Sequence, residues 1–196
     1  MSNPSFLNEI DFLFKEVLKV NVLTHAAEFK EQSPEQFSSA IKETLEFATN
    51  HLSKLQDVKV NISESELSIP SEFQVAWQEF KKSNILKYLI PKQYGGDGLP
   101  KTVSTAVKEA LIASNPSFYI YVMLNLEAAG LIEKFGTKNQ NKQYCQKLYN
   151  LEWSGALSYT EAQADCEWDA IETYAKPAGN SYSITGQKSL VAAGMH

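Results

Sequence analysis

The chain has its densest turn signal at Gly95, Gly96 and Gly98, three glycines within four positions. A backbone so rich in glycine adopts conformations that are closed to other residues, and it can cradle a phosphate group. Neither the Walker nor the Rossmann glycine spacing is present, however. The sequence therefore favours a tight connection between two helices over a phosphate-binding loop.

The cysteines and histidines form no metal-binding pattern. Cys145 and Cys166 have no metal-ligand spacing with His25, His51 or His196. Two cysteines in 196 residues suit a reducing compartment better than a disulfide-stabilised fold. For Cys166, a small buried thiol is the simpler interpretation, and a reactive thiol is the alternative.

The charged residues limit the classes of partner. The net charge is -5 and no stretch concentrates lysine and arginine, so we do not expect a nucleic-acid partner. Segment 1–22 mixes charged residues into its apolar pattern, which predicts neither a signal peptide nor a membrane span. We therefore expect a cytoplasmic protein. One acidic run has the composition of a solvated face: Glu161, Asp165, Glu167, Asp169 and Glu172.

Up to about residue 150, apolar residues recur at spacings of three and four, which predicts helices. The predicted ranges are 5–22, 34–55, 71–80, 100–114, 118–135 and 137–148. Ser33 with Gln36, and Thr137 with Gln140, have the spacing of a capping box at a helix start. Gly136 has the position of a C-cap.

Segment 118–135 is apolar almost all round, which predicts a central, buried helix. Its side chains Phe118, Tyr119, Tyr121 and Met123 are interpreted as core, with the wall of an acyl pocket as the alternative.

The pattern changes after Asn150. Short runs separated by Gly, Asn and Pro predict antiparallel strands at 153–159, 170–174, 182–185 and 189–192. Strands this few and short close a core poorly, because open edges and one uncovered face remain. We therefore expect a mainly α chain: an all-helical domain, residues 1–150, then part of a β domain, residues 151–196. Either the chain is a fragment, or another copy or a partner covers the β surface.

Four motifs together resemble the acyl-CoA dehydrogenase family. Segment 90–100, IPKQYGGDGLP, resembles P-x-x-Y-G-G-x-G-L, and segment 131–140 resembles the hG-x-x-x-Q turn. Segment 153–161, WSGALSYTE, resembles W-x-G-x-x-x-L-T-E-P, and segment 184–188, ITGQK, resembles I-x-G-x-K. Segment 98–107 resembles the long bacterial subfamily, which includes broad-range acyl-CoA and methylmercaptopropionyl-CoA dehydrogenases. The resemblance covers nearly the whole chain.

The resemblance implies a helical N-terminal domain, a β middle domain and a C-terminal four-helix bundle, usually in a homo-oligomer. It also implies FAD as cofactor and acyl-CoA as substrate. In that family a glutamate of the bundle removes the α-proton while the β-hydride passes to the flavin. This chain ends before the bundle, so we expect no turnover from it alone.

The resemblance also assigns cofactor-binding residues. The loop from Leu157 through Ser158 would lie along the flavin, with the Tyr159 backbone and the Thr160 hydroxyl hydrogen-bonded to its pyrimidine end. The second segment would approach the other face of the ring: Leu190, Val191 and Ala192. Cys166 occupies the position of a family serine and would contact both cofactor and substrate. A plain turn is the alternative for Thr160 and Glu161.

Several of these positions depart from the family pattern. Asp165 replaces a glycine and adds negative charge near the diphosphate, and Cys166 replaces serine with a weaker donor. Leu190, Val191 and Ala192 replace an aromatic-Ile-Ser/Thr triplet, which removes a stacking ring and a hydroxyl. Each lost hydrogen bond costs about 1–3 kcal/mol, so we expect weakened flavin retention.

The departures leave two other interpretations open. One is a degenerate, non-catalytic homologue that acts as an assembly or scaffold protein. The other is an unrelated helical interaction module, against which the order of the motifs and the lack of a heptad seam argue.

Overall fold

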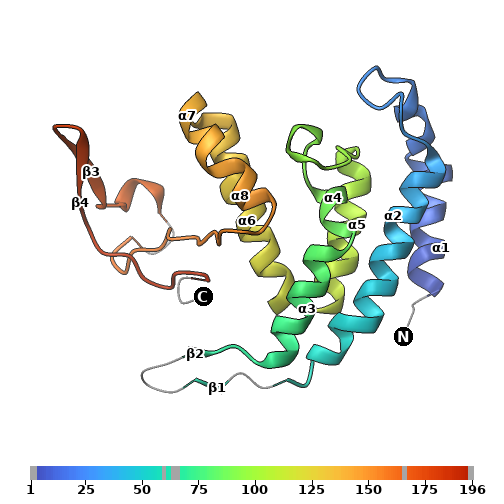
Figure 1. The fold of residues 1–196 in the computed structure, drawn as a ribbon, viewed down its shortest axis with the longest axis horizontal. Coiled ribbons are helices and arrows are strands. Elements are labelled where there is room, and N and C mark those ends of the chain that lie inside the picture. Colours follow the sequence, from blue (N-terminus) through green and yellow to red (C-terminus); the bar gives the residue numbers. More distant parts are fainter. Residues whose placement is uncertain (1–3, 59–60, 63–66, 165–166, 194–196) are drawn as a thin grey trace.

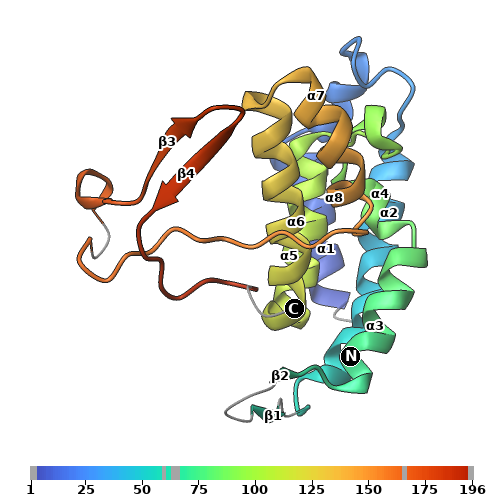
Figure 2. The same ribbon diagram turned by 60° about the vertical axis from the view of Figure 1, so that its left-hand side comes forward.

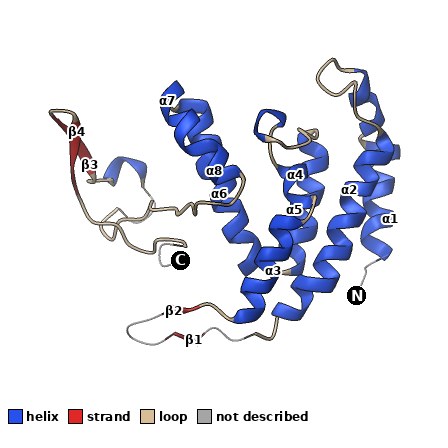
Figure 3. Ribbon diagram, in the orientation of Figure 1, coloured by secondary structure: helices blue, strands red, loops and turns tan. Residues whose placement is uncertain are grey.

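The structure is a computed structural model that describes residues 4–58, 61–62, 67–164 and 167–193. Helices form one bundle, and the C-terminal strands project from its side (Figures 1 and 2). The α-helices are α1 Pro4–Phe12, α2 Pro34–Phe47, α3 Ser71–Lys82, α4 Ile85–Leu89, α5 Lys101–Ser114, α6 Pro116–Phe135, α7 Lys138–Gln140 and α8 Gln146–Tyr149. The strands are β1 Asn61–Ile62, β2 Leu67–Ser68, β3 Tyr174–Ala178 and β4 Ser181–Thr185 (Figure 3). The predicted fold class is confirmed. None of the described helices combines the length and apolar character needed to cross a membrane.

Shorter helical turns extend several of these elements. The π-helical segments are Leu13–Val17, Ala48–Leu52 and Asn141–Cys145. The 3-10 segments are Val20–His25, Ser53–Leu55, Lys92–Tyr94 and Trp168–Ala170.

The N-terminal helix differs from the single predicted helix 5–22. After α1 the chain makes a π-helical segment, and Lys19 then adopts a left-handed backbone conformation with φ 49°. A π turn holds more residues than an α turn, so it rotates the apolar stripe. As a result Phe14 is buried, whereas Val17, which the α-helical spacing placed in the stripe, is exposed.

Helix α2 begins where the sequence predicts, at Pro34. The hydroxyl of Ser33 accepts a hydrogen bond from the Gln36 backbone N–H, 3.2 Å away. The Gln36 side chain does not complete the capping box, because its Nε2 lies 3.5 Å from Oδ2 of Asp97. Gln32 also contacts the loop that contains Asp97: its Nε2 donates to the backbone oxygens of Asp97 and Gly98.

Helices α2, α5 and α6 pack side by side and enclose the core. Its largest side chains with almost no exposure are Phe37, Phe80 and Phe118. The rings of Phe80 and Phe118 meet edge to face with centroids 5.6 Å apart, a favoured aromatic geometry. Tyr119 is buried in the same core cluster, and burial raises the pKa of its phenol to about 12. The core interpretation is thus confirmed for Phe118 and Tyr119.

Helix α6 is less enclosed than its composition predicts. Its N-terminal half is largely buried, but Leu131 and Phe135 near its C-terminus are 62% and 72% exposed.

The next helical stretch, α7 to α8, starts at Thr137 with a complete capping box to Gln140. That predicted cap is confirmed. Gly136 ends α6 in an extended conformation, and a Cβ there would lie 2.5 Å from the Ile132 oxygen.

The glycine-rich segment connects α4 to α5, which agrees with the helix-connection interpretation. Gly95 has φ 89°, in the left-handed region that favours glycine. Gly96 lies so close to the preceding helix end that a Cβ would be 2.0 Å from the Ile90 oxygen. Glycine is therefore required at these two positions by backbone shape and by packing.

The C-terminal part forms fewer strand contacts than predicted. Strands β3 and β4 make an antiparallel hairpin in which Tyr174 pairs with Thr185, and every residue of both strands is exposed. Predicted strand 170–174 is wrong over most of its length, because Ala170 ends a 3-10 turn and β3 begins only at Tyr174. Predicted strands 153–159 and 189–192 are reduced to a single bridge, Leu157 with Ala192. A second hairpin, β1 with β2, lies in a linker where no strand was predicted.

Candidate functional site

Two segments distant in sequence lie side by side beyond the helical bundle: 157–161 and 188–192. The backbone N–H of Ala192 donates to the Leu157 oxygen over 3.1 Å, and the Leu157 N–H donates back over 3.3 Å. Three residues along, the Ser189 N–H donates to the Thr160 oxygen over 2.9 Å. The predicted neighbourhood of these segments is therefore present, although only one residue pair has ladder geometry.

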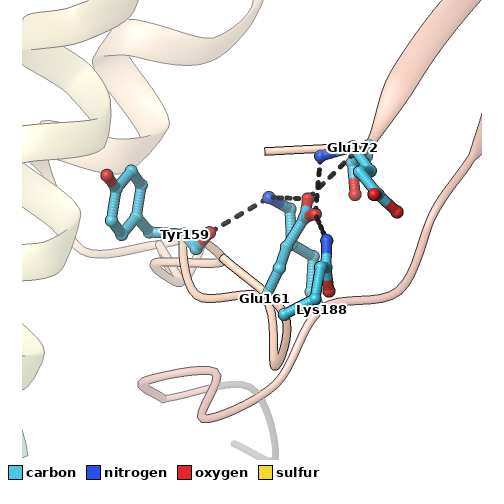
Figure 4. Close-up of polar contacts among 6 residues, drawn as sticks. Tyr159, Glu161, Glu172 and Lys188 are labelled. Atoms are coloured by element: carbon cyan, nitrogen blue, oxygen red, sulfur yellow. Dashed lines mark hydrogen bonds and ion pairs between the residues drawn. The ribbon is translucent and has the colours of Figure 1, made fainter. Parts of the chain in front are cut away.

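Glu161, the last residue of the first segment, is buried, with 1% of its surface exposed. The prediction that it belongs to a solvated face is wrong. Its carboxylate accepts hydrogen bonds from the backbone N–H groups of Glu172 and Thr173, at 2.8 and 3.0 Å, and from Nε2 of Gln163 at 2.6 Å. Figure 4 shows the backbone N–H of Glu172 directed at this carboxylate.

Lys188 is the cationic partner of Glu161. Its Nζ lies 2.7 Å from Oε1 of Glu161 and also donates to the Tyr159 backbone oxygen over 3.0 Å (Figure 4). The Lys188 ammonium and the surrounding N–H donors hold the pKa of Glu161 far below its usual range. Glu161 is therefore an anion at neutral pH.

The sequence patterns did not predict this pair, because each residue belongs to a different motif and no pattern connects the two. Glu161 appeared only as part of an acidic run, and Lys188 only as the end of the I-x-G-x-K motif. The available signal was the pair of opposite charges within two motifs that the resemblance places around one cofactor. A carboxylate is rarely buried without such a partner.

The predicted cofactor-binding residues differ in the exposed fraction of their surface. Leu157 is 56% exposed and Leu190 is 87% exposed, so both present apolar surface. Val191 and Ser158 are also exposed, and Ala192 is half-buried. Leu190 has φ 51°, a left-handed conformation that branched residues seldom adopt.

The backbone oxygens of Tyr159 and Thr160 both accept hydrogen bonds from the second segment. The Tyr159 oxygen is bound by Lys188, and the Thr160 oxygen is bound by Ser189. Within the described residues, neither the backbone N–H nor the hydroxyl of Thr160 has a partner. Cys166, assigned to both cofactor and substrate, and Asp165 lie outside the described residues.

Helix α6 anchors the start of the first segment. The side chain of Asn125, 3% exposed, accepts a hydrogen bond from the Gly155 N–H over 2.9 Å and donates to the Tyr121 oxygen over 2.7 Å. Trp153, two residues earlier, has the Lys147 ammonium 4.1 Å from its ring centroid. Segment 157–161 therefore begins from a fixed point on the bundle.

This geometry suits a flat, mostly apolar ring with polar atoms at one end. The exposed side chains of Leu157 and Leu190 offer apolar contact, while the N–H and hydroxyl of Thr160 offer hydrogen bonds. A flavin has both kinds of surface, and the residues present fit it. The described residues contain no group of three or more His, Cys, Asp or Glu side chains able to hold a metal ion.

Comparison with known proteins gives a consistent result. Residues 33–152, more than half of the chain, match the acyl-CoA dehydrogenase N-terminal domain family. The 3-methylmercaptopropionyl-CoA dehydrogenase of Ruegeria pomeroyi is 29% identical over 129 residues, which are 65% of this chain and 22% of that protein. The mitochondrial isobutyryl-CoA dehydrogenase of Dictyostelium discoideum is 26% identical over 54% of this chain and 25% of its own length.

The fold is also found among solved structures. Glutaryl-coenzyme A dehydrogenase in complex with glutaryl-CoA superposes with a TM-score of 0.65 at 21% identity, covering 82% of this chain and 40% of that one. The chain thus spans well under half the length of the relatives that it matches. It belongs to the acyl-CoA dehydrogenase family, and it corresponds to the N-terminal portion of that family's members.

Proposed function

We propose that the chain forms the N-terminal and flavin-facing part of an FAD-dependent acyl-CoA dehydrogenase, which introduces a double bond between the α- and β-carbons of an acyl-CoA thioester. The main support is the pairing of Leu157 with Ala192, because it brings together the two segments that the resemblance assigns to the cofactor. The named relatives act on acyl-CoA substrates, which supports the same substrate class here.

Each segment has its own part in the proposed site. The Thr160 N–H and hydroxyl would bind the polar end of the flavin, while Leu157, Leu190 and Val191 would exclude water from its ring. Ser158, Tyr159 and Ala192 would contribute backbone surface, and Cys166 is proposed to contact cofactor and substrate. When bound, FAD would accept the hydride from the β-carbon of the substrate.

The proposal assigns no catalytic base to this chain. The resemblance places that glutamate in the C-terminal bundle, so the residues here would bind and orient rather than remove the α-proton. The division into an all-helical domain, 1–150, and a partial β domain, 151–196, is part of the proposal. So are the homo-oligomer and the cytoplasmic location.

Titration of the purified chain with FAD tests the proposal. We expect saturable binding, seen as quenching of flavin fluorescence and a shift of its visible absorbance. Thr160→Val should weaken binding by about three- to tenfold, the loss of one hydrogen bond, whereas Thr105→Val on the exposed face of α5 should not change it.

Two outcomes would contradict the proposal. A chain that folds but binds no FAD would favour a non-catalytic homologue. Reduction of an electron-accepting dye by the chain alone with an acyl-CoA would show that a base is present after all.

A further inference from the structure

We infer that Glu161 and Lys188 are positioning residues: they hold the Tyr159–Thr160 peptide group so that the donor groups of Thr160 face the flavin. This inference rests on the proposed function for the identity of the ligand. The contacts within the chain do not depend on that identity. They connect Glu161 on the first segment, Lys188 on the second, and the start of β3 through Thr173.

The first step is the orientation of one peptide group. In a trans peptide the C=O and the following N–H point in opposite directions, and the described residues contain no cis peptide bond. The Tyr159 oxygen points at Lys188. The Thr160 N–H must therefore point away from Lys188, and it makes no hydrogen bond to a described residue.

The second step is that both carbonyl groups around Thr160 are already bound. Lys188 binds the oxygen of residue 159, and the neighbouring Ser189 N–H binds the oxygen of residue 160. The groups of Thr160 without a partner among the described residues are its N–H, which can only donate, and its hydroxyl, which can also donate. Donors at this point select a ligand with acceptor oxygens or nitrogens, as the pyrimidine end of an isoalloxazine ring has.

The third step explains why Glu161 is needed. A lysine that is 22% exposed has partly lost its hydration, and a buried carboxylate at 2.7 Å compensates for that loss. The donors from Gln163, Glu172 and Thr173 hold the carboxylate in place. Glu161 thus fixes the Lys188 ammonium, and Lys188 fixes the peptide group.

The experiment uses Glu161→Gln and Lys188→Met in the full chain. Lys82→Met is the matched control, because Lys82 forms an exposed ion pair with Glu79. The first measurement needs no flavin: amide hydrogen exchange at Ser189 and Ala192, whose N–H groups donate to the first segment. We expect both test variants to lose protection at these amides while α2, α5 and α6 keep theirs, and the control to match the wild type.

The second measurement is the affinity for FAD, with the visible spectrum of the bound flavin. We expect the test variants to bind about tenfold more weakly, the effect of losing a charge-assisted contact, and the bands of the bound flavin to shift. Lys188→Arg should recover most of the affinity, because it keeps the cation.

The outcomes distinguish the positioning role of Glu161 and Lys188 from the proposed function of the chain. Lost protection with unchanged affinity and spectrum would overturn the positioning role, since the pair would then be structural only. Unchanged protection would overturn it as well. If the wild-type chain binds no FAD, the proposed function fails, and the exchange data alone decide whether the pair holds the segments together.

Discussion

Substitution of Gly155 tests how the site is anchored on the helical bundle. Gly155 lies against α6, where its N–H donates to the Asn125 side chain. A Cβ added to Gly155 would lie 2.6 Å from the Leu124 backbone oxygen and 3.1 Å from Cβ of Ala128. Gly155→Ala therefore forces the segment away from α6, because the helix backbone cannot move aside.

The expected loss of stability follows from the overlap of the added Cβ with the backbone of α6. Insertion of a methyl group into a packed contact costs about 1–3 kcal/mol, and displacement of Gly155 also weakens its bond to the buried Asn125. For a chain of this size, each kcal/mol shifts the melting temperature by about 2–4 °C. We expect Gly155→Ala to lower the free energy of unfolding by about 1–3 kcal/mol and to weaken FAD binding.

Gly130 provides the matched control within α6. The nearest atom to a Cβ built there is the Tyr149 hydroxyl oxygen at 3.8 Å, an ordinary contact distance. Gly130→Ala should therefore raise the stability by about 0.5–1 kcal/mol, the usual gain from alanine within a helix. Urea unfolding followed by circular dichroism measures both variants. If Gly155→Ala were as stable as Gly130→Ala, the docking of this segment on α6 would be refuted.

Three further predictions concern the core, a helix cap and the buried acid. Phe118→Ala should destabilise the chain by about 3–5 kcal/mol, whereas Phe135→Ala, at a site 72% exposed, should change stability little; thermal unfolding compares them. Thr137→Ala should cost about 1 kcal/mol, because it removes the capping box before α7. The pKa of Glu161 is lowered in the folded state from the usual 4.5, so its ionised form stabilises the fold above that pH. The stability advantage of the wild type over Glu161→Gln should shrink as pH falls below 4.5, and urea midpoints at pH 7 and pH 3 would measure it.

The helical part was predictable because its signals are local. The Ser33 cap, the Thr137 capping box and the apolar stripe of α5 each depend on residues within one or two turns. The errors have a local cause too. The π-helical segment after α1 rotates the stripe by a fraction of a turn, and the periodicity of an α-helix does not anticipate it.

The site was predictable only in outline, because its contacts join residues distant in sequence. Motif order placed segment 157–161 near segment 188–192, and the structure has them paired. Neither motif alone indicated that Glu161 is buried, since an acidic residue in a charged run resembles solvated surface. Burial there depends on Lys188 and on backbone donors at residues 172 and 173, which no local pattern connects to it.

The polar character of this contact has a physical reason. Both faces of the β3–β4 hairpin are exposed, so apolar burial contributes little to the alignment of the segments that flank it. Registers that differ by one residue change atomic positions by about 3.3 Å along a strand. A slip of that size would separate Lys188 from Glu161, now 2.7 Å apart, and leave a buried carboxylate without its cation. The pair therefore favours one register, the one in which Leu157 faces Ala192 and the donors of Thr160 remain open to a ligand.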